Sequence, residues 1–448
     1  MSSVFVAWPT SPTDQDVLAY NASATPSQWT NKTLPTVMLS DAMFPTYTDW
    51  TTKIQQAITT YLPNGGIVDA RALIPSGGLQ NGTVNPFAPG GTLVTVPIII
   101  LLGEGTWNTA IPIVIPSLCR LVGEGRGCTT VSAGSGFSNP GSVAPALAVV
   151  CLGPGGATKV FGARVESMTI NGNSISGVIG VYGYALQEQC GAFDVAVSYP
   201  DSWGFQIEGT SEHCRIVDCV VSLPTTNSPG GLQIMSSGYI LVERFTATGN
   251  SPTSPDTNIG IDIESSPGVV LINCHAEQCS TAFQVYDSSA VTLIQCDVAG
   301  ASYVVTNGVL YEGTSGGLTI LGLKAVVTSK VTYLLSDVVN NITFGGGIAS
   351  LGFYSTGRES SPQTVISTEQ SIPFLLFHAP ITIDAAAVST APASSVCFGN
   401  NFQNPTGASN NVTANAAGGG AGPANPLKVV QFLQIYSGTT SYWIPLMQ

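Results

Sequence analysis

Two carboxylates that lie two residues apart in a repeating segment are the side chains best suited to chemistry. Asp262 and Glu264 alternate with apolar residues, so on a β-strand both point to the same face, with Cα atoms about 6.6 Å apart. Divergence of the side chains would bring the carboxyl groups into the roughly 6.5–9.5 Å range of inverting glycosidases, in which one acid protonates the leaving oxygen and the other activates water. We predict this pair as catalytic, with Glu208 as a third acid about 9.6 Å away, two rungs earlier.

Amide and aromatic side chains recur at matching positions of the neighbouring repeats. Amides hydrogen-bond to sugar hydroxyls and aromatic faces stack on pyranose rings. These residues are therefore predicted to bind substrate: Gln206, Gln233, Gln284 and Tyr286. Trp203, in the turn before the first repeat, is a further candidate, with a position tucked against the coil as its alternative. The alternative for the whole set is a plain polar surface.

Other reactive side chains have simpler interpretations. His275 and Asp297 occupy equivalent positions on adjacent rungs. They could form either a structural ion pair or a general-base dyad. Cys219, Cys274 and Cys296 share one repeat position. They are expected either to be buried free thiols or to include a disulfide between Cys274 and Cys296. No metal site is predicted, because none of the three histidines has zinc-ligand spacing with a cysteine.

A repeated five-residue pattern must position these side chains. The segments read small, apolar, polar, apolar and then a mostly polar residue, with Leu310 as the exception at the third position, and they start at residues 204, 231, 260, 282 and 308. Each is followed by a second apolar run, and the residues expected to point inward on successive coils include Phe193, Cys219, Phe245, Cys274 and Cys296. Loops are predicted to leave the coils at 224–230 and 250–258. Self-similarity at this period indicates a solenoid. Alternating strands with no room for a crossover helix make it a β-solenoid, so the predicted fold class is all-β.

The two ends of the solenoid are predicted to differ. Residues 49–61 form one amphipathic helix, with Trp50, Ile54 and Tyr61 on its apolar face, and this helix would cap the open solenoid end. Residues 429–446 read as a β-hairpin around a Ser-Gly-Thr-Thr turn. The predicted organisation is an extended arm at 1–40, a parallel β-helix at 41–356 and an irregular C-terminal region at 357–448 that ends in the hairpin.

Composition excludes several partners. The formal charge is −13 with only 13 Lys and Arg residues, whereas nucleic acids and anionic membranes require basic surfaces. The longest apolar run, residues 93–102, is interrupted by Pro97 and falls short of the roughly 20 residues of a membrane-spanning helix. The first residues carry no signal peptide. We expect an extracellular, cell-surface or virion location, reached after signal removal or by another route.

Residues 49–68 and two Gly-Glu-Gly turns at 103–105 and 123–125 resemble right-handed parallel β-helix proteins of the pectate-lyase-like superfamily. The resemblance implies a right-handed single-stranded β-helix and a carbohydrate-active protein, either a glycoside hydrolase or a polysaccharide lyase. No cofactor is expected, except Ca²⁺ in a lyase. Phage members of this superfamily are commonly trimers, so we predict a homo-oligomer that associates through the C-terminal hairpin.

The chain also departs from the known enzymes of this superfamily. The polygalacturonase hallmarks are missing, and the candidate lyase bases are few: Arg215, Arg244 and Lys324. Polyuronates would be repelled by the net negative charge, so a neutral or weakly charged polysaccharide is the predicted partner. Whether the chain is an enzyme stays open, and the competing class is a non-catalytic structural or adhesive β-helix, such as a surface fibre or a phage tail component.

Overall fold

A computed structural model describes the backbone of the chain from Asp16 to Leu446 with gaps. The described ranges are 16–21, 28–40, 42–73, 81–140, 144–156, 158–223, 229–249, 258–299, 305–313 and 316–326, followed by short strands up to residue 446. Side chains are described within these ranges from residue 34 to residue 323. Most of the loops predicted at 224–230 and 250–258 lies outside the described residues.

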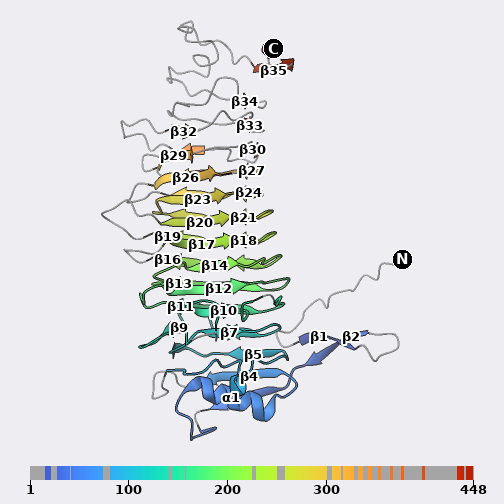
Figure 1. Ribbon diagram of the computed structural model, residues 1–448, viewed down its shortest axis with the longest axis vertical. Helices are drawn as coiled ribbons and strands as arrows, with labels where there is room; N and C mark the ends of the chain where they lie inside the picture. Colours follow the sequence, from blue (N-terminus) through green and yellow to red (C-terminus); the bar gives the residue numbers. More distant parts are fainter. Residues whose placement is uncertain are drawn as a thin grey trace.

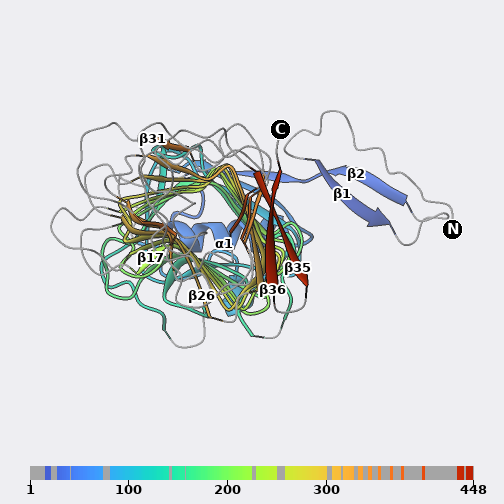
Figure 2. The same ribbon diagram turned by 90° about the horizontal axis from the view of Figure 1, so that it is seen from above.

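The fold is a parallel β-helix in which three long sheets run side by side along one axis (Figures 1 and 2). The first sheet contains β7 (Ile113–Ile115), β10 (Ala148–Leu152), β12 (Ile179–Tyr184), β14 (Phe205–Glu208), β17 (Gly230–Met235), β20 (Ile259–Glu264), β23 (Thr281–Tyr286), β26 (Val305–Glu312), β29 (Val331–Ser336) and β32 (Thr364–Ile366).

The second and third sheets share two long strands, β11 (Arg164–Asn171) and β13 (Gly191–Ser198). The other strands of the second sheet are β3 (Thr36–Ser40), β4 (Gly66–Ala72), β5 (Ile98–Leu101), β8 (Arg120–Val122), β15 (Arg215–Val217), β18 (Leu241–Glu243), β21 (Val270–Ile272), β24 (Ser289–Ile294), β27 (Gly316–Leu321), β30 (Ile342–Gly345), β33 (Leu375–Phe377) and β34 (Val396–Phe398). The third sheet adds β6 (Gly105–Thr109), β9 (Thr129–Ala133), β16 (Val220–Ser222), β19 (Thr246–Thr248), β22 (His275–Glu277), β25 (Asp297–Ala299), β28 (Lys324–Val326) and β31 (Gly352–Tyr354).

A left-handed backbone residue turns the chain from the second sheet into the third on successive coils. Asp218, Arg244, Asn273 and Gln295 occupy this corner with φ between 51° and 56°. The residue after each corner points inward and is buried: Cys219, Phe245, Cys274 and Cys296. The corner thus fixes which side chains face the core and, by alternation, which face solvent.

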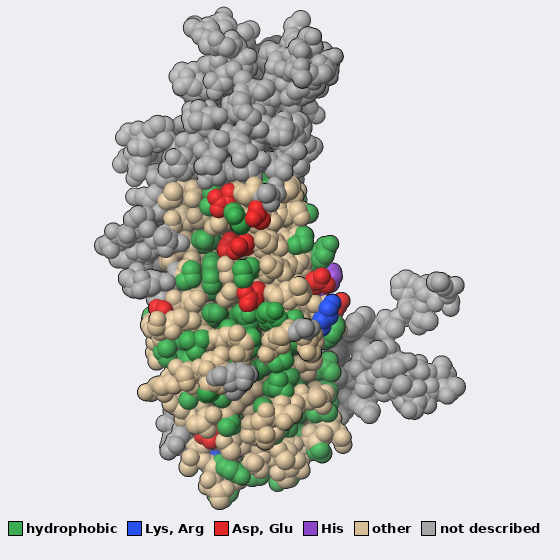
Figure 3. All heavy atoms as spheres, in the orientation of Figure 1, with side chains coloured by type: hydrophobic (Ala, Val, Ile, Leu, Met, Phe, Trp, Pro, Cys, Tyr) green, Lys and Arg blue, Asp and Glu red, His purple; other side chains and the backbone are tan. Residues whose placement is uncertain are grey.

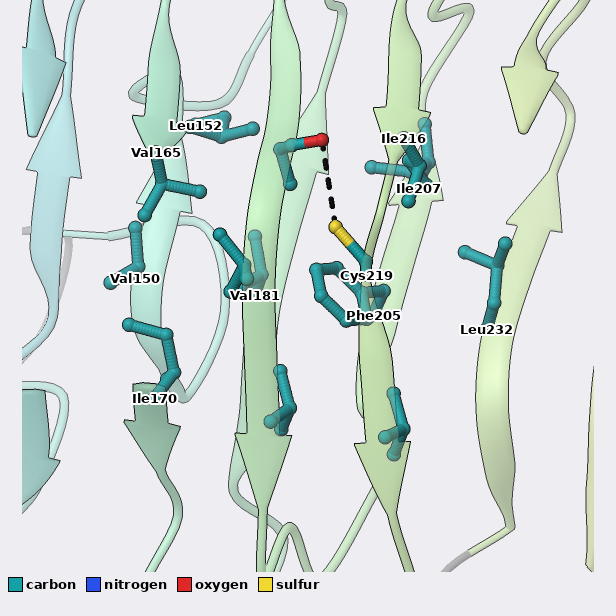
Figure 4. Packing of buried hydrophobic residues seen from close by; sticks show 14 of the residues in the cluster. Val150, Leu152, Val165, Ile170, Val181, Phe205, Ile207, Ile216, Cys219 and Leu232 are labelled. Carbon is teal, nitrogen blue, oxygen red and sulfur yellow. Dashed lines mark hydrogen bonds between the residues drawn. The ribbon is translucent and has the colours of Figure 1, made fainter. Parts of the chain in front are cut away.

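The interior is filled by the inward side chains of all three sheets. Val165, Val181, Phe205 and Cys219 lie among them in Figure 4, and each is completely buried. Phe193 was expected at an inward position, but the corner at Asp194 (φ 53°) directs Val195 inward instead. Phe193 faces outward, and its ring centroid lies 5.3 Å from the Arg164 guanidinium carbon.

The predicted cap is helix α1 (Trp50–Tyr61), at the N-terminal end of the stack (Figure 1). Asp49 caps it by accepting a hydrogen bond from the Thr52 amide at 2.8 Å. Trp50 and Ile54 are buried as predicted, whereas Tyr61 is 50% exposed and Leu62 takes the buried position beyond it. Helix α1 therefore covers the open end of the core, as a solenoid cap must.

Both ends of the chain carry an antiparallel hairpin. β1 (Asp16–Asn21) pairs with β2 (Gln28–Thr33), and Figures 1 and 2 show this pair projecting from the side of the coil. β35 (Gln431–Ser437) pairs with β36 (Thr440–Leu446), which confirms the predicted C-terminal hairpin. Parallel pairing begins at β3, within the segment expected as an arm, and it continues to β34, beyond the expected boundary at residue 356.

The fold also limits how the chain can meet a membrane. Within the described ranges, no helix is long and apolar enough to cross a bilayer.

Candidate functional site

Two columns of side chains project from the first sheet, one residue from each strand. The register aligns Tyr182, Gln206, Gln233, Asp262 and Gln284 in one column. It aligns Tyr184, Glu208, Met235, Glu264, Tyr286 and Glu312 in the other. We call these the Asp262 column and the Glu264 column. Every residue predicted for the site except Trp203 lies in one of them.

The Asp262 carboxyl is the least ordinary group in these columns. Its residue is only 5% exposed. Gln233 Nε2 donates a hydrogen bond to its Oδ2 at 3.1 Å, whereas its buried Oδ1 has no hydrogen-bond partner among the described residues. Burial raises the pKa of Asp262 to about 6 against an opposing effect of Gln233, and the charges of Glu264 and Glu312 raise it further. A carboxyl of this kind keeps its proton up to about pH 6 and has an oxygen free for a ligand.

Glu264 contrasts with its neighbour. It lies two residues further along β20, on the same outward face, and it is half-buried. Its carboxylate accepts no hydrogen bond from the described residues, and no Lys or Arg among them pairs with it. A partly solvated carboxylate beside a protonated one is the combination that acid–base hydrolysis requires.

Glu208 is held by other residues. Tyr182 Oη donates a short hydrogen bond to its Oε1, and Gln206 Nε2 lies 3.4 Å from its Oε2. Burial and the bond to Glu208 raise the pKa of Tyr182 far above its ordinary value. The register places Glu208 two rungs from Glu264, as predicted, but its oxygens are already engaged by neighbouring side chains.

The remaining amides and aromatic residues flank the acids. Gln284 lies beside Asp262 in its column and donates from Nε2 to Glu312 Oε1 at 3.1 Å. Tyr286 lies between Glu264 and Glu312 in the other column and is 36% exposed. Tyr286 is therefore the aromatic ring of these columns that is most available to a ligand.

Trp203 does not form a platform in this structure. It is 8% exposed and belongs to an apolar cluster with Tyr182 and Cys151 on the outside of the first sheet. A Cβ at Gly230 would lie only 2.2 Å from the Trp203 ring, so the absence of a side chain at Gly230 lets the indole pack there. The tucked position, which was the sequence-based alternative, is the one observed.

A ladder of buried serines fixes the turns directly after these columns. Ser211, Ser237, Ser266 and Ser288 are each no more than 3% exposed. Each hydroxyl donates to the carbonyl of a residue two or three positions earlier, at 2.7–2.9 Å. Ser266 Oγ also accepts from the Ser237 amide, and Ser288 Oγ accepts from the Ser266 amide. The ladder therefore holds successive rungs of the Glu264 column together.

Tyr182, Tyr184 and the serines were not predicted. The first repeat was placed at residue 204, although residues 180–184 occupy the same strand position one coil earlier. Gly183 replaces the apolar residue there and hides the pattern. The serines do carry a sequence signal, because they recur at intervals of 26, 29 and 22 residues in step with the acids.

The charge of this face is one-sided. Glu208, Asp262 and Glu264 form no ion pair with any Lys or Arg that the structure describes. Figure 3 shows acidic side chains gathered on the middle of this face, with the basic side chains to one side. Such a surface favours a ligand with hydroxyl donors and little negative charge.

His275 and Asp297 meet on the third sheet, away from these columns. Their strands pair in register, and His275 Nδ1 makes a short contact with Asp297 Oδ1. Nε2 lies 3.5 Å from Glu277 Oε2. The hydrogen bond to Asp297 is the main cause of a raised pKa of His275. With a carboxylate at each ring nitrogen, the arrangement is that of a structural ion pair.

The ladder cysteines are buried free thiols. Cys219, Cys274 and Cys296 are at most 1% exposed, and burial raises the pKa of Cys219 to about 12. Within the described ranges, no cluster of three or more His, Cys, Asp or Glu side chains is arranged to hold a metal ion.

Comparison with known proteins agrees with this architecture. A family model described as "Right handed beta helix region" matches residues 158–324, which contain the acids of the site. This match gives the β-helix its right hand. No curated protein matches the sequence.

Several solved structures are similar to this chain at low identity. The gp42 tailspike of Acinetobacter phage vb_AbaP_AS12 has 12% identity and a TM-score of 0.49 over 79% of this chain, which spans 58% of the tailspike. Geobacillus virus E2 ORF18 has 15% identity and a TM-score of 0.42, with 74% of this chain and 68% of that chain covered. The endo-xylogalacturonan hydrolase of Aspergillus tubingensis has 11% identity and a TM-score of 0.42, with 83% and 94% covered.

Proposed function

From a right-handed parallel β-helix that carries a buried carboxyl beside a half-exposed one, we propose that this protein hydrolyses glycosidic bonds of a neutral or weakly charged polysaccharide. Asp262 is the general acid and Glu264 the general base that activates water. The observation that carries the proposal is the pairing of a raised pKa with an unpartnered, buried Oδ1 at Asp262. Residues two apart on one strand have Cα atoms about 6.6 Å apart, and divergence of the two side chains would bring their carboxyl groups into the roughly 6.5–9.5 Å range used for inversion.

The flanking residues have proposed roles in binding. Gln233 and Gln284 lie on either side of Asp262, and their amide groups are suited to hold sugar hydroxyls along the column. Tyr286, beside Glu264, offers an aromatic face for a sugar ring. Glu208, tied to Tyr182 and Gln206, supports the substrate-binding surface rather than the bond-breaking step.

We further propose that this chemistry uses no cofactor, with Ca²⁺ needed only if the protein is a lyase. The polysaccharide substrate implies an extracellular, cell-surface or virion location. Self-association through the β35–β36 hairpin, as a trimer, belongs to the same proposal. The absence of a cofactor, the location and the trimer can each be tested separately, and a negative result for one of them leaves the roles proposed for Asp262 and Glu264 unchanged.

A non-catalytic, adhesive β-helix is the second candidate, and one observation favours it. Three acids of the two columns, Glu208, Asp262 and Glu312, each have a neighbouring Tyr or Gln within hydrogen-bond distance. Such a network stabilises a polar sheet surface without any catalytic role.

The experiment that separates the two is a screen of the purified chain against neutral and capsular polysaccharides for new reducing ends or unsaturated products. With an active substrate in hand, Glu264→Gln should lower kcat at least ~100-fold, the lower end for loss of a general acid or base. The kcat/KM value should fall as pH rises past about 6, where Asp262 loses its proton. Unsaturated products, or activity that EDTA abolishes, would favour the lyase.

The matched control is Glu243→Gln, the same substitution on the outer face of the second sheet, which should leave the rate unchanged. Retention of sugar binding by Glu264→Gln, measured by affinity electrophoresis, would separate catalysis from adhesion. Full activity of Glu264→Gln would contradict the proposed base. Binding without cleavage by the wild-type chain across the whole panel would establish the adhesive candidate.

A further inference from the structure

The outer face of the second sheet is apolar where that of the first sheet is polar. Five outward side chains form a contiguous group that we call the apolar stripe: Leu241, Val270, Ile272, Ile294 and Leu321. Leu241 and Val270 are paired neighbours in one column, and Ile272, Ile294 and Leu321 follow one another in the adjacent column. All five are half-buried, so each keeps part of its surface in solvent.

Outward positions of one coil carry acids on the first sheet and apolar side chains on the second, so the coil geometry itself does not require an apolar outer face. On β20 the outward residues are Asp262 and Glu264, whereas on β21 of the same coil they are Val270 and Ile272. Threonines at the matching positions of β24 and β27, Thr292 and Thr319, extend the uncharged surface. Large contiguous apolar patches on soluble proteins mark binding sites more often than isolated apolar side chains do.

Acids do not dominate beside the stripe, although the chain as a whole carries a net charge of −13: Arg215 adjoins Leu241 in one column and Glu243 adjoins Ile272 in the other. Further along the same sheet and its corner, Arg120 pairs with Glu166 at 2.5 Å and Arg126 with Asp194 at 2.6 Å. Arg244 pairs with both Asp218 and Glu243. Most of the ion pairs that arginines form in the described part of the chain therefore lie on this sheet or at its corner.

We propose that the apolar stripe is the lateral contact between copies of this chain. Two strongly acidic molecules repel each other across most of their surfaces, but the second sheet is the face where that repulsion is neutralised. The stripe repeats at the rung spacing of about 4.8 Å. A second copy has the same spacing, so its side chains can fit between these over the four strands of the stripe, β18, β21, β24 and β27. The contact is independent of the proposed hydrolysis and lies on a different sheet from Asp262.

The test is the mass of the full chain in solution, measured by sedimentation velocity and light scattering. The wild-type chain should sediment as a multiple of 46.1 kDa at micromolar concentration. The double variant Ile272→Glu with Ile294→Glu should shift toward 46.1 kDa, because it places like charges in the contact. The matched control carries the same two charges on adjacent rungs of the third sheet, Ser222→Glu with Thr248→Glu, and should keep the wild-type mass.

A milder pair guards against misfolding. Ile272→Thr with Ile294→Thr keeps the β-branched shape and should raise the dissociation constant at least ~10-fold with an unchanged circular dichroism spectrum. A wild-type chain that is monomeric throughout, or a folded Glu pair with the wild-type mass, would overturn the proposal. If removal of residues 427–448 alone gives monomers while both stripe variants assemble normally, association depends on the hairpin and the stripe has no part in it.

Discussion

Asp262 illustrates how burial alone can prepare a side chain for chemistry. No Lys or Arg in the described part of the chain pairs with it, and the single amide bound to it favours the ionised form. Desolvation nevertheless dominates and raises the pKa to about 6. The residue therefore costs stability at neutral pH, which is typical of a group kept for function rather than for the fold.

That cost predicts a pH-dependent effect of Asp262→Asn. The folded pKa of about 6 lies above the ordinary 3.8, so the stability associated with Asp262 is present below about pH 4 and is lost as pH rises through 6. At about 1.4 kcal/mol per pKa unit the loss is about 3 kcal/mol. The Asn variant should therefore match the wild type at pH 4 and exceed it at pH 7.5 in urea unfolding. Equal stability of the Asn variant and the wild type at both pH values would contradict the raised pKa of Asp262.

His275 offers a second test at a single residue. Its pKa is raised chiefly by the hydrogen bond to Asp297, so the stability it contributes is present at low pH and is lost as pH rises through the raised value. Asp297→Asn should return the pKa of His275 toward 6.5, as followed by NMR titration of the ring protons. An unchanged His275 would rule out Asp297 as the cause.

Prediction from sequence succeeded for residues whose position follows from alternation. Gln233 and Asp262 face outward in the expected register because each sits between two buried apolar residues, and Glu264 takes the next outward position after the buried Ile263. It failed where a corner shifted the alternation by one, as at Phe193. It also could not reveal that Asp262 is buried and Glu264 is not, because the two occupy equivalent positions in the sequence pattern.

Among the elements, the turns after the first sheet depend on the serine ladder. Ser266→Ala would leave the Ser237 amide and the Glu264 carbonyl without the Ser266 hydroxyl. Loss of a buried partner costs roughly 1–3 kcal/mol, so the thermal midpoint should fall while the circular dichroism spectrum keeps its shape. Ser222→Ala, at an exposed serine on the third sheet, is the control and should stay within about 0.5 kcal/mol. Equal loss of stability in both variants would show that the buried serine hydroxyls stabilise the fold no more than an exposed one does.

The elements were predictable to different degrees. Helix α1 and the terminal hairpin carry strong local signals, the first in its 3.6-residue period and the second in its turn residues. Coil boundaries are less local, because β34 lies in a segment whose Ala, Asn, Gly and Pro content predicts a linker. There the rung below supplies the pairing that the segment's own composition does not indicate.

At the scale of the whole molecule, the three sheets differ more in their outer faces than in their cores. On the first sheet, Glu208, Asp262 and Glu264 form no ion pair with a Lys or Arg that the structure describes, and the second sheet carries the apolar stripe with Arg215 and the Arg244–Glu243 pair beside it. A solenoid permits this division because each outer face is one continuous surface along the axis. A ligand and a second copy of the chain can therefore occupy different sides without competing.

The stacking of coils in register has a consequence for the length of the molecule. Ile259 of β20 is paired with Thr281 of β23, so one coil here is 22 residues long, the difference between these numbers. Excision of residues 259–280 should bring Gln233 beside Gln284 and Met235 beside Tyr286, which closes the gap with matching neighbours. We expect a shorter protein with a β-rich spectrum and cooperative melting, but without activity. A shortened chain that does not melt cooperatively would contradict this. Cooperative melting of the shortened chain would mean that the length of this protein can change by whole coils without loss of the fold.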